Sequence, residues 1–366
     1  MKSILVVGLG RVGSRTLRYL LNLVKNVQVH AVDVDASKLI PFKNYENVEV
    51  HLYEPGILGR LSSEVDLAVT ALPSKVAFRA VLEIAGRCTS IVDVSFFAED
   101  PYQLSKVVED CGSTLVVDAG FAPGYSNIVA GYAYYELGLG EDIEIAVGGI
   151  PSEPIPPIGY VITWNPRDLL EEYTRPARYV ENYEVKAAKP VESVRKVEVE
   201  GIGMLEAFLS DGLRTMLRNL NAKNMRELTL RWPGHMSAIR LLYELGLLEE
   251  EELEVNGVRV KPIDVVAKVL EKKLSIKASD IAVLQVTASS HGRTYRELAV
   301  LRGTPEEPAT AVFTALVHAY TAKLALEGRI KKGVVAPEEL YGYKQEYEEF
   351  LKSMGVVIRR QLVAEL

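Results

Sequence analysis

The chain has 366 residues, of which 48% are hydrophobic and 25% are charged, and its formal net charge is −7. This length exceeds that of one ordinary α/β domain and predicts two domains, each with enough apolar residues for a core. The negative charge argues against nucleic acid and against an anionic membrane as partners, because both favour basic surfaces. No apolar run approaches the length of a membrane span, and the N-terminus leads straight into a strand pattern, so we expect a cytoplasmic protein.

Only two cysteines occur, Cys88 and Cys111. Two thiols in so long a chain favour a reducing compartment and no disulfide framework. Zinc is not expected for the same reason, and we predict no metal site.

A glycine-rich turn follows the first predicted strand. Ile4 to Val7 form a short apolar run, typical of a strand that helices cover on both faces. The run ends at the turn GLGRVG. In a Rossmann unit Gly8 would form the tight turn, Gly10 would let the backbone approach a pyrophosphate, and Gly13 would allow close packing of helix on strand.

The helix expected from about Val12 to Val24 would present its N-terminal amides to the phosphates. A second strand is predicted from Val27 to Val32, and Asp33 stands at its end, 20 residues after Gly13. A carboxylate there can accept hydrogen bonds from both ribose hydroxyls and repels a 2′-phosphate, which favours NAD over NADP. Asp35 is the alternative for this role.

The pattern continues with strands expected at residues 48–52, 67–72, 90–94 and 114–117, and with helices at 75–85 and 101–111. The loop Ala71-Leu72-Pro73-Ser74 would lie at the sheet edge where a dinucleotide crosses, although a plain turn explains it equally well. Asp93 and Asp118 follow two of these strands and are expected at the same edge. The residues expected at the dinucleotide are Gly8, Gly10, Arg11, Val12, Gly13, Asp33, Leu72 and Pro73.

From residue 143 the pattern changes to strand-like stretches at 143–150, 160–164 and 194–203, around a proline cluster at 151–157. Helices at 211–220 and 236–245 and a strand at 281–289 would complete a second domain on an antiparallel or mixed sheet. The apolar helix expected at 310–326 would pack back onto the first domain. The predicted fold class is therefore α/β: a Rossmann doubly wound parallel sheet of residues 1–125 plus 305–366, with an inserted α+β substrate domain of residues 126–304.

A series of motifs runs along nearly the whole chain: GLGRVG, ALPS, VDVSF, DAGFAPGYSN, GYVITWNPRDLLEEYTRPA, GIGMLEAF, ELTLRWPGH and GRIKKGVVAPEEL. In this order they resemble the saccharopine dehydrogenase-like family, and within it the lysine 6-dehydrogenases. The resemblance implies a Rossmann domain with returning C-terminal helices and a second domain for substrate binding and dimerisation. It also implies a homodimer that acts on a carbon bearing nitrogen.

Saccharopine-forming members typically carry GLDPG where this chain has Gly120-Phe121-Ala122-Pro123-Gly124. Ala122 cannot exchange a proton, so the resemblance favours NAD-dependent oxidative deamination of the terminal amine of L-lysine, which gives the semialdehyde or piperideine carboxylate, ammonia and NADH. A saccharopine dehydrogenase is the alternative. The turn also resembles nucleotide-binding modules that gate potassium channels, which are much shorter, so a non-enzymatic dinucleotide sensor is a third possibility.

Oxidation of the ε-carbon requires a neutral amine, whose pKa is about 10.4 when free, so a base or a dry pocket must remove a proton. The acid–base candidates are Asp93, Asp118 and His235. The substrate-binding candidates are Arg231, whose guanidinium could hold a carboxylate, Trp232, which could cover the aliphatic stem, and His291. Arg231 could instead form a salt bridge or an interface, and His235 could cap a helix. Tyr160 and Trp164 are expected in the core.

Overall fold

The computed structural model describes residues 1–162 and 166–364, so Trp164 lies outside the described residues. The chain divides into two compact units, Met1–Gly131 with Ala311–Leu351 and Tyr132–Thr310 with Lys352–Leu366. The division expected from the sequence assigns residues 352–366 to the first unit. They belong instead to the second unit, because β18 (Val357–Ala364) pairs with β16 (Arg293–Arg302).

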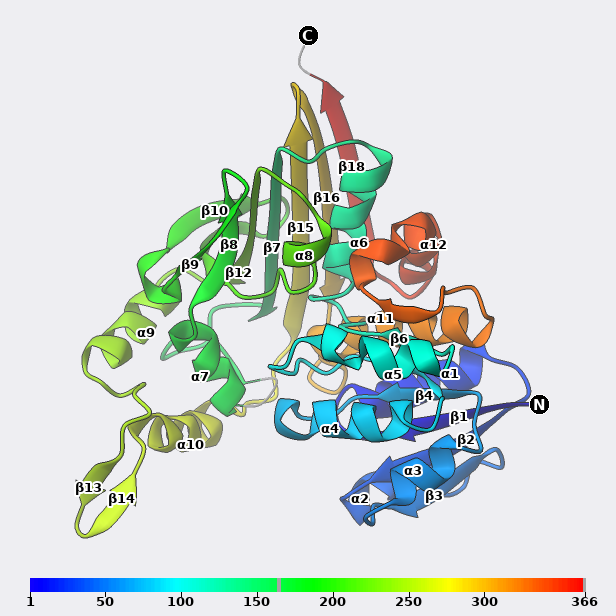
Figure 1. Ribbon diagram of the computed structural model, residues 1–366. Coiled ribbons are helices and arrows are strands. Elements are labelled where there is room, and N and C mark those ends of the chain that lie inside the picture. Colours follow the sequence, from blue (N-terminus) through cyan, green and yellow to red (C-terminus); the bar gives the residue numbers. More distant parts are fainter. Residues whose placement is uncertain (163–165, 365–366) are drawn as a thin grey trace. The chain divides into compact units, whose positions relative to one another are not determined.

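The first unit is built on a seven-stranded sheet, as far as the described residues show, in the order β17-β6-β5-β4-β1-β2-β3. Figure 1 labels β1, β2, β3, β4 and β6 of this sheet. All its pairings are parallel. Strand order reverses between β1 and β4, which is the switch point where doubly wound sheets bind dinucleotides. The predicted Rossmann sheet is confirmed. Its strands are β1 (Lys2–Val7), β2 (Val27–Asp33), β3 (Val48–Leu52), β4 (Leu67–Thr70), β5 (Ser90–Asp93), β6 (Thr114–Val116) and β17 (Gly333–Val335).

Helices of the first unit cover this sheet because their apolar stripes pack on its buried strands, as in the cluster of Leu5, Val81 and Ile91. The segment expected as one helix at 101–111 consists of a 3₁₀ turn and a short α-helix. The helices are α1 (Gly13–Leu23), α2 (Ala36–Leu39), η1 (Ile40–Phe42), α3 (Ile57–Ser62), α4 (Ser74–Ala85), η2 (Pro101–Leu104), α5 (Ser105–Asp110), α6 (Tyr125–Gly131), α11 (Ala309–Leu326), η5 (Pro337–Tyr343) and α12 (Lys344–Ser353).

One helix in the described part of the chain, α11, is long and apolar enough to cross a membrane by length and composition, although no apolar run of that length was expected. It has a mean hydropathy of 1.3, and 78% of it is buried inside the structure. Core helices of soluble proteins share these properties, and Phe313, Leu316 and Val317 of α11 are indeed buried.

Cys88 and Cys111 form a disulfide, so the expectation that no disulfide occurs is wrong. Cys88 follows α4 and Cys111 follows α5, and the two Cα atoms lie 4.9 Å apart. This Cα separation is within the range that a disulfide spans. The two cysteines are 23 residues apart in the sequence, and the number of cysteines alone could not predict that the ends of α4 and α5 meet.

The second unit contains a mixed sheet, in agreement with the expectation. Its strand order is β10-β11-β12-β7-β15-β16-β18, and β8 pairs with both β12 and β9. Strand β12 runs parallel to β7, and the other pairs described in this sheet are antiparallel. The strands are β7 (Asp142–Pro151), β8 (Ala177–Glu181), β9 (Glu184–Ala188), β10 (Arg195–Val199), β11 (Gly203–Ser210), β12 (Asn224–Arg231), β15 (Asp280–Ser290), β16 and β18, beside a separate hairpin of β13 (Leu253–Val255) and β14 (Val258–Val260).

Two expected elements of the second unit differ. Residues 160–162, the described part of an expected strand, are not in a strand, and the amide of Ile162 donates to the carbonyl of Leu274 at 3.0 Å. The helix expected at 211–220 is limited to α8, because Arg214 has a φ of 50°. The helical segments here are η3 (Tyr132–Glu136, a π-turn), α7 (Pro166–Thr174), η4 (Pro190–Glu192), α8 (Met216–Asn219), α9 (His235–Glu244) and α10 (Pro262–Leu274).

Candidate functional site

The three glycines after β1 occupy different environments. A Cβ on Gly13 would lie 1.8 Å from the carbonyl oxygen of Gly8, and one on Gly8, whose φ is +87°, would lie 2.4 Å from the carbonyl oxygen of Ala71. Both positions therefore require glycine for packing within the chain. A Cβ on Gly10 would meet nothing among the described residues within 4 Å. The chain itself gives no reason for glycine at position 10, which suits a position that a ligand approaches.

Asp33 lies at the carboxyl end of β2 and holds the glycine turn. Its Oδ2 accepts a hydrogen bond from the Leu9 amide at 2.7 Å, and its Oδ1 accepts one from the Asp35 amide at 2.8 Å. Each carboxylate oxygen has a second lone pair, so Asp33 keeps acceptor capacity for a ligand hydroxyl. Lys38 Nζ lies 3.7 Å from Oδ1. Asp35 instead caps α2, accepting from the amide of Ser37 at 2.9 Å.

The loop after β4 lies against the glycine turn. The Ala71 amide donates to the carbonyl of Val7 at 2.9 Å, and the Leu72 amide donates to Ser95 Oγ at 3.0 Å. Ser95 Oγ in turn donates to Asp93 Oδ1 at 2.8 Å. The structure thus brings Leu72 and the glycine turn together at the switch point of the sheet. Asp93 holds the loop in place through Ser95.

Asp93 and Asp118 follow the adjacent strands β5 and β6, and both are buried. Asp93 accepts hydrogen bonds from Thr70 Oγ1 at 2.5 Å and from the Ser95 amide at 3.0 Å. Burial, with a smaller contribution from Asp118, raises the pKa of Asp93 to about 7 despite these bonds. The proximity of the two carboxyl groups follows from the parallel strands, as the sequence predicts.

The turn from Gly120 to Gly124 is held by Asn127 and Glu338, which were not among the site residues expected from the sequence. Gly124 has a φ of +134°, and a Cβ there would lie 1.9 Å from the Gly120 carbonyl oxygen. Asn127 Oδ1 accepts from the Gly124 amide at 3.1 Å, and its Nδ2 donates to the buried Glu338 Oε2 at 3.3 Å. Glu338 belongs to the motif APEEL, which the sequence shows, but Asn127 lies 211 residues before it, so the contact could not be predicted from the motif.

His318 on α11 is a second buried residue that was missed. One ring nitrogen, Nε2, lies 3.1 Å from the Val92 carbonyl, and Nδ1 lies 3.2 Å from Thr16 Oγ1. A carbonyl can only accept, so Nε2 carries the proton and Nδ1 accepts from Thr16. Burial lowers the pKa of His318 to about 4, which keeps the ring neutral. His318 on α11 therefore connects this helix to α1 and to β5.

In the second unit Arg231 lies at the end of β12 with only 3% of its surface exposed. Its Nη2 donates to Glu172 Oε2 at 2.7 Å, its Nη1 to the Leu230 carbonyl at 3.0 Å, and its Nε to Tyr173 Oη at 3.4 Å. The guanidinium also lies 4.6 Å from the ring centre of the buried Tyr160. This is the geometry of the salt-bridge alternative, so a substrate role for Arg231 stays a prediction.

His235 begins α9 and is buried beside Arg231. Its Nδ1 lies 2.8 Å from the Ile158 carbonyl and must donate to it, so Nε2 accepts from Tyr173 Oη at 2.8 Å. Burial and the charge of Arg231 lower the pKa of His235 to about 3. The helix cap comes from Glu206, whose two oxygens accept from the amides of Gly234 and Met236 at 2.9 Å.

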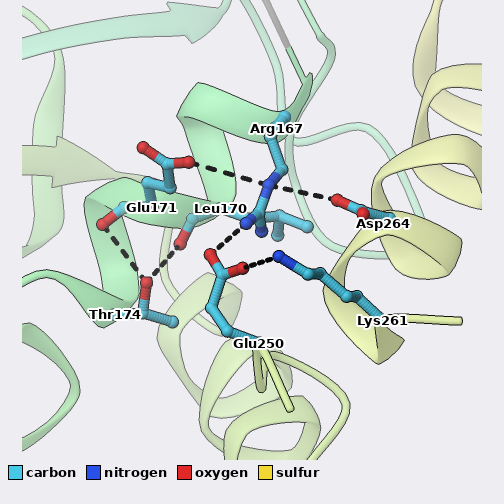
Figure 2. A network of polar contacts seen from close by, with 7 residues as sticks. All are labelled: Arg167, Leu170, Glu171, Thr174, Glu250, Lys261 and Asp264. Atoms are coloured by element: carbon cyan, nitrogen blue, oxygen red, sulfur yellow. Dashed lines mark hydrogen bonds and ion pairs between the residues drawn. The ribbon is translucent and has the colours of Figure 1, made fainter. Parts of the chain in front are cut away.

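Helix α7, which carries Glu172 and Tyr173, is fixed by a group of charged side chains (Figure 2). Arg167 at its start donates to Glu250 and lies 3.2 Å from Asp264 Oδ1 of α10. Lys261 Nζ contacts the other oxygen of Glu250 at 3.3 Å. These contacts join the start of α7 to α10, and α7 carries Glu172 and Tyr173, the partners of Arg231.

Trp232 and His291 lie at different places in this unit. Trp232 is half-buried and donates from Nε1 to the Pro151 carbonyl at 2.8 Å. His291 occupies the turn between β15 and β16, and its side chain is 86% exposed. Strand register places Arg231 about nine residues along the sheet from His291, or roughly 30 Å at 3.3 Å per residue. His291 therefore cannot share a substrate site with Arg231 in one chain.

Comparison with known proteins gives a consistent result. Residues 120–357 match the model of the saccharopine dehydrogenase C-terminal domain. The chain is 25% identical over 280 residues to the mitochondrial alpha-aminoadipic semialdehyde synthase of Rattus norvegicus, covering 68% of this chain and 29% of that protein. It is 22% identical over 265 residues to a saccharopine dehydrogenase [NADP(+), L-glutamate-forming] of Pyricularia oryzae, covering 69% of this chain and 59% of that protein.

The chain thus spans 29% and 59% of the length of these two curated relatives. Among solved structures, the apo saccharopine dehydrogenase (L-Glu forming) from Saccharomyces cerevisiae matches with a TM-score of 0.82 at 16% identity, and both chains are covered completely. At this identity the match establishes the fold.

Proposed function

Because the chain belongs to the saccharopine dehydrogenase family, we propose that it is an NAD-dependent amino-acid dehydrogenase that oxidises the terminal amine of L-lysine. A nicotinamide dinucleotide, when bound, would accept the hydride from the carbon that bears the nitrogen. The amine loses a proton, and water then hydrolyses the imine to the semialdehyde and ammonia. The observation that supports the dinucleotide part of the proposal most directly is the open Gly10 at the turn held by Asp33, and the substrate rests on the family and on Ala122.

The residues at the switch point suit a dinucleotide. Helix α1 has 11 residues and no acidic side chain in its first turn, so its N-terminal amides offer a favourable place for a pyrophosphate. The open space at Gly10 lets a phosphate approach the backbone, while Gly8 and Gly13 keep the turn tight. Leu72, bound to Ser95, would lie beside the same ligand.

The choice of NAD over NADP is the finer part of the proposal. The Asp33 carboxylate, already held by the Leu9 amide, would accept the ribose hydroxyls and repel a 2′-phosphate. The nearby Lys38 opposes this preference, since a cation can accommodate that phosphate. The Pyricularia oryzae relative is named as NADP(+)-dependent, so the balance between these two side chains needs direct measurement.

For proton transfer we favour the carboxyl pair over His235. The pKa of Asp93 near 7 would let it exchange a proton at neutral pH, and Asp118 lies close enough to influence it. Both ring nitrogens of His235 are occupied, and its lowered pKa makes it a poor base near neutrality. Asp93 also holds Ser95, so it positions the loop at Leu72 whether or not it exchanges a proton.

For the substrate α-carboxylate we retain Arg231, with Trp232 beside the aliphatic stem. Glu172 already occupies Nη2 of Arg231, so a bound carboxylate would have to displace Glu172 or share the guanidinium with it. This requirement makes the anchor the part of the proposal that mutation tests most sharply.

The decisive experiment incubates the purified protein with NAD and a panel of amines, while NADH absorbance is followed. Lysine should support NADH formation, with ammonia and a cyclised product released in equal amounts. NADH formation that requires saccharopine, with none from lysine, would overturn the substrate assignment. It would favour the second candidate, a saccharopine dehydrogenase, which the names of the curated relatives support.

Tight NADH binding without turnover of any amine would point to a dinucleotide-sensing module instead. The proposal also includes a homodimer in the cytoplasm, and light scattering of the purified protein would measure its mass in solution.

A further inference from the structure

Three side chains with metal-binding groups meet at the edge of the first sheet, outside the site described above. His30 lies on β2, and Glu49 and His51 lie on the edge strand β3. In the parallel register His30 is paired with Glu49, and His51 is two residues further along β3. Side chains alternate along a strand, so all three point to the same face of the sheet.

The donor atoms lie at separations close to those of a tetrahedral metal site. His30 Nδ1 and His51 Nε2 are 3.0 Å apart. Glu49 Oε2 lies 3.5 Å from His30 Nδ1, and Oε1 lies 3.8 Å from His51 Nε2. Zinc bound to nitrogen and oxygen at about 2.0–2.1 Å requires ligand atoms roughly 3.3–3.4 Å apart. Shifts of a few tenths of an ångström would therefore bring all three groups onto one ion.

The cluster is also accessible and electrostatically suited to a cation. The imidazoles are 16% and 13% exposed, and the Glu49 side chain is 60% exposed, which leaves a route for an ion and room for water. At 3.5 and 3.8 Å the carboxylate makes no hydrogen bond to either ring. The close contact within the cluster is thus between His30 Nδ1 and His51 Nε2, one of which carries a proton. When a metal ion binds, that proton would move to the other nitrogen of the same ring, so that both facing nitrogens have a free lone pair.

We propose that His30, Glu49 and His51 bind one zinc ion or a similar divalent transition-metal ion, with water as the fourth ligand. Two imidazoles and one carboxylate form a ligand set that suits zinc, cobalt, nickel and copper better than magnesium or calcium. The ion cross-links β3, the edge strand, to β2, which ends at Asp33. It thereby fixes the strand that positions Asp33.

The test uses zinc chloride in calorimetric titration of the full-length protein after removal of metal with a chelator, and cobalt chloride as a spectroscopic probe. We expect one ion per chain and the intense visible absorption of four- or five-coordinate cobalt. His51→Ala and Glu49→Gln should each weaken zinc binding more than about a hundredfold, because loss of even an outer partner of a ligand costs about 10- to 100-fold. Zinc should raise the melting temperature of the wild type and not that of Glu49→Gln.

The matched control is His291→Ala, which removes an exposed histidine lying 3.8 Å from Glu141 and should leave binding unchanged. His235 and His318 have both ring nitrogens engaged inside the protein. Circular dichroism of each variant without metal shows whether it folds, and Glu49→Gln preserves side-chain shape. Failure to bind zinc or cobalt, or binding that survives in both folded variants of the cluster, would overturn the proposal.

Discussion

The substitution Gly10→Val separates binding from folding at the turn after β1. A Cβ at position 10 meets nothing within 4 Å among the described residues, so valine should change the free energy of unfolding by no more than about 0.5 kcal/mol. The side chain would instead occupy the space through which a pyrophosphate approaches. Loss of one charge-assisted hydrogen bond costs about 1.5–3 kcal/mol, so NADH affinity should fall roughly ten- to over a hundredfold.

Gly13→Ala provides the opposite case within the same turn. Its Cβ would lie 1.8 Å from the backbone oxygen of Gly8, and ordinary contacts begin near 3.4 Å. The backbone must therefore move by more than 1 Å, and overpacking of this kind costs about 1–3 kcal/mol or more. Gly13→Ala should therefore mainly reduce the free energy of unfolding, whereas Gly10→Val should mainly reduce the affinity for NADH.

Both variants are measured by urea unfolding and by titration with NADH, followed through nucleotide fluorescence. Wild-type NADH affinity in folded Gly10→Val would refute the assignment of the turn to a dinucleotide. A large loss of stability in that variant would refute the argument that position 10 is open within the chain.

Three further predictions concern individual side chains. Asp33→Ala should weaken NAD binding and raise the catalytic efficiency with NADP relative to that with NAD, whereas Lys38→Ala should lower this ratio. If steady-state kinetics shows the same ratio in both variants as in the wild type, other residues select the cofactor. Arg231→Lys should reduce catalytic efficiency with lysine roughly ten- to over a hundredfold and leave cadaverine, which lacks the carboxylate, nearly unaffected. Equal losses would show that Arg231 serves the fold through Glu172. Because burial raises the pKa of Asp93 from 3.8 to about 7, the folded state binds a proton at this carboxyl more tightly than the unfolded state does. Proton binding therefore adds fully to the free energy of unfolding below about pH 4, and this contribution is lost as pH rises to about 7. The free energy of unfolding of the wild type relative to Asp93→Asn should fall over that range by up to roughly 4 kcal/mol, measured by urea unfolding at several pH values, and a flat difference would contradict the buried environment of Asp93.

The parts of the fold predicted from the sequence are those with strong local signals. The alternation of apolar strand, glycine turn and amphipathic helix fixes β1, α1 and β2, because each depends on neighbouring residues. The failures involve partners distant in sequence. The final strand β18 pairs with β16 some 60 residues before it, and its residues are nearly all exposed, so its sequence shows no alternation of buried and exposed positions.

The same distinction explains the candidate site. Asp93 and Asp118 were correctly expected at one edge because the ends of adjacent parallel strands must coincide. The partner of Arg231 was not predictable, because Glu172 precedes it by 59 residues on a helix whose position depends on Arg167 and α10. Spacing alone likewise cannot reveal that His30 and His51 meet, since that contact depends on the register of β2 and β3.

The division of the chain has a consequence for biosynthesis. The first sheet is completed by β17 at residues 333–335, although its other strands lie before residue 117. During translation those six strands emerge while the position beside β6 is unfilled, and residues Tyr132–Thr310 of the second unit follow before β17 can dock. The second unit in turn gains β18 only after the first is complete. Ribosome-bound chains that stop before residue 333 should therefore expose the β6 edge, and protease sensitivity in this segment should decline once β17 has emerged.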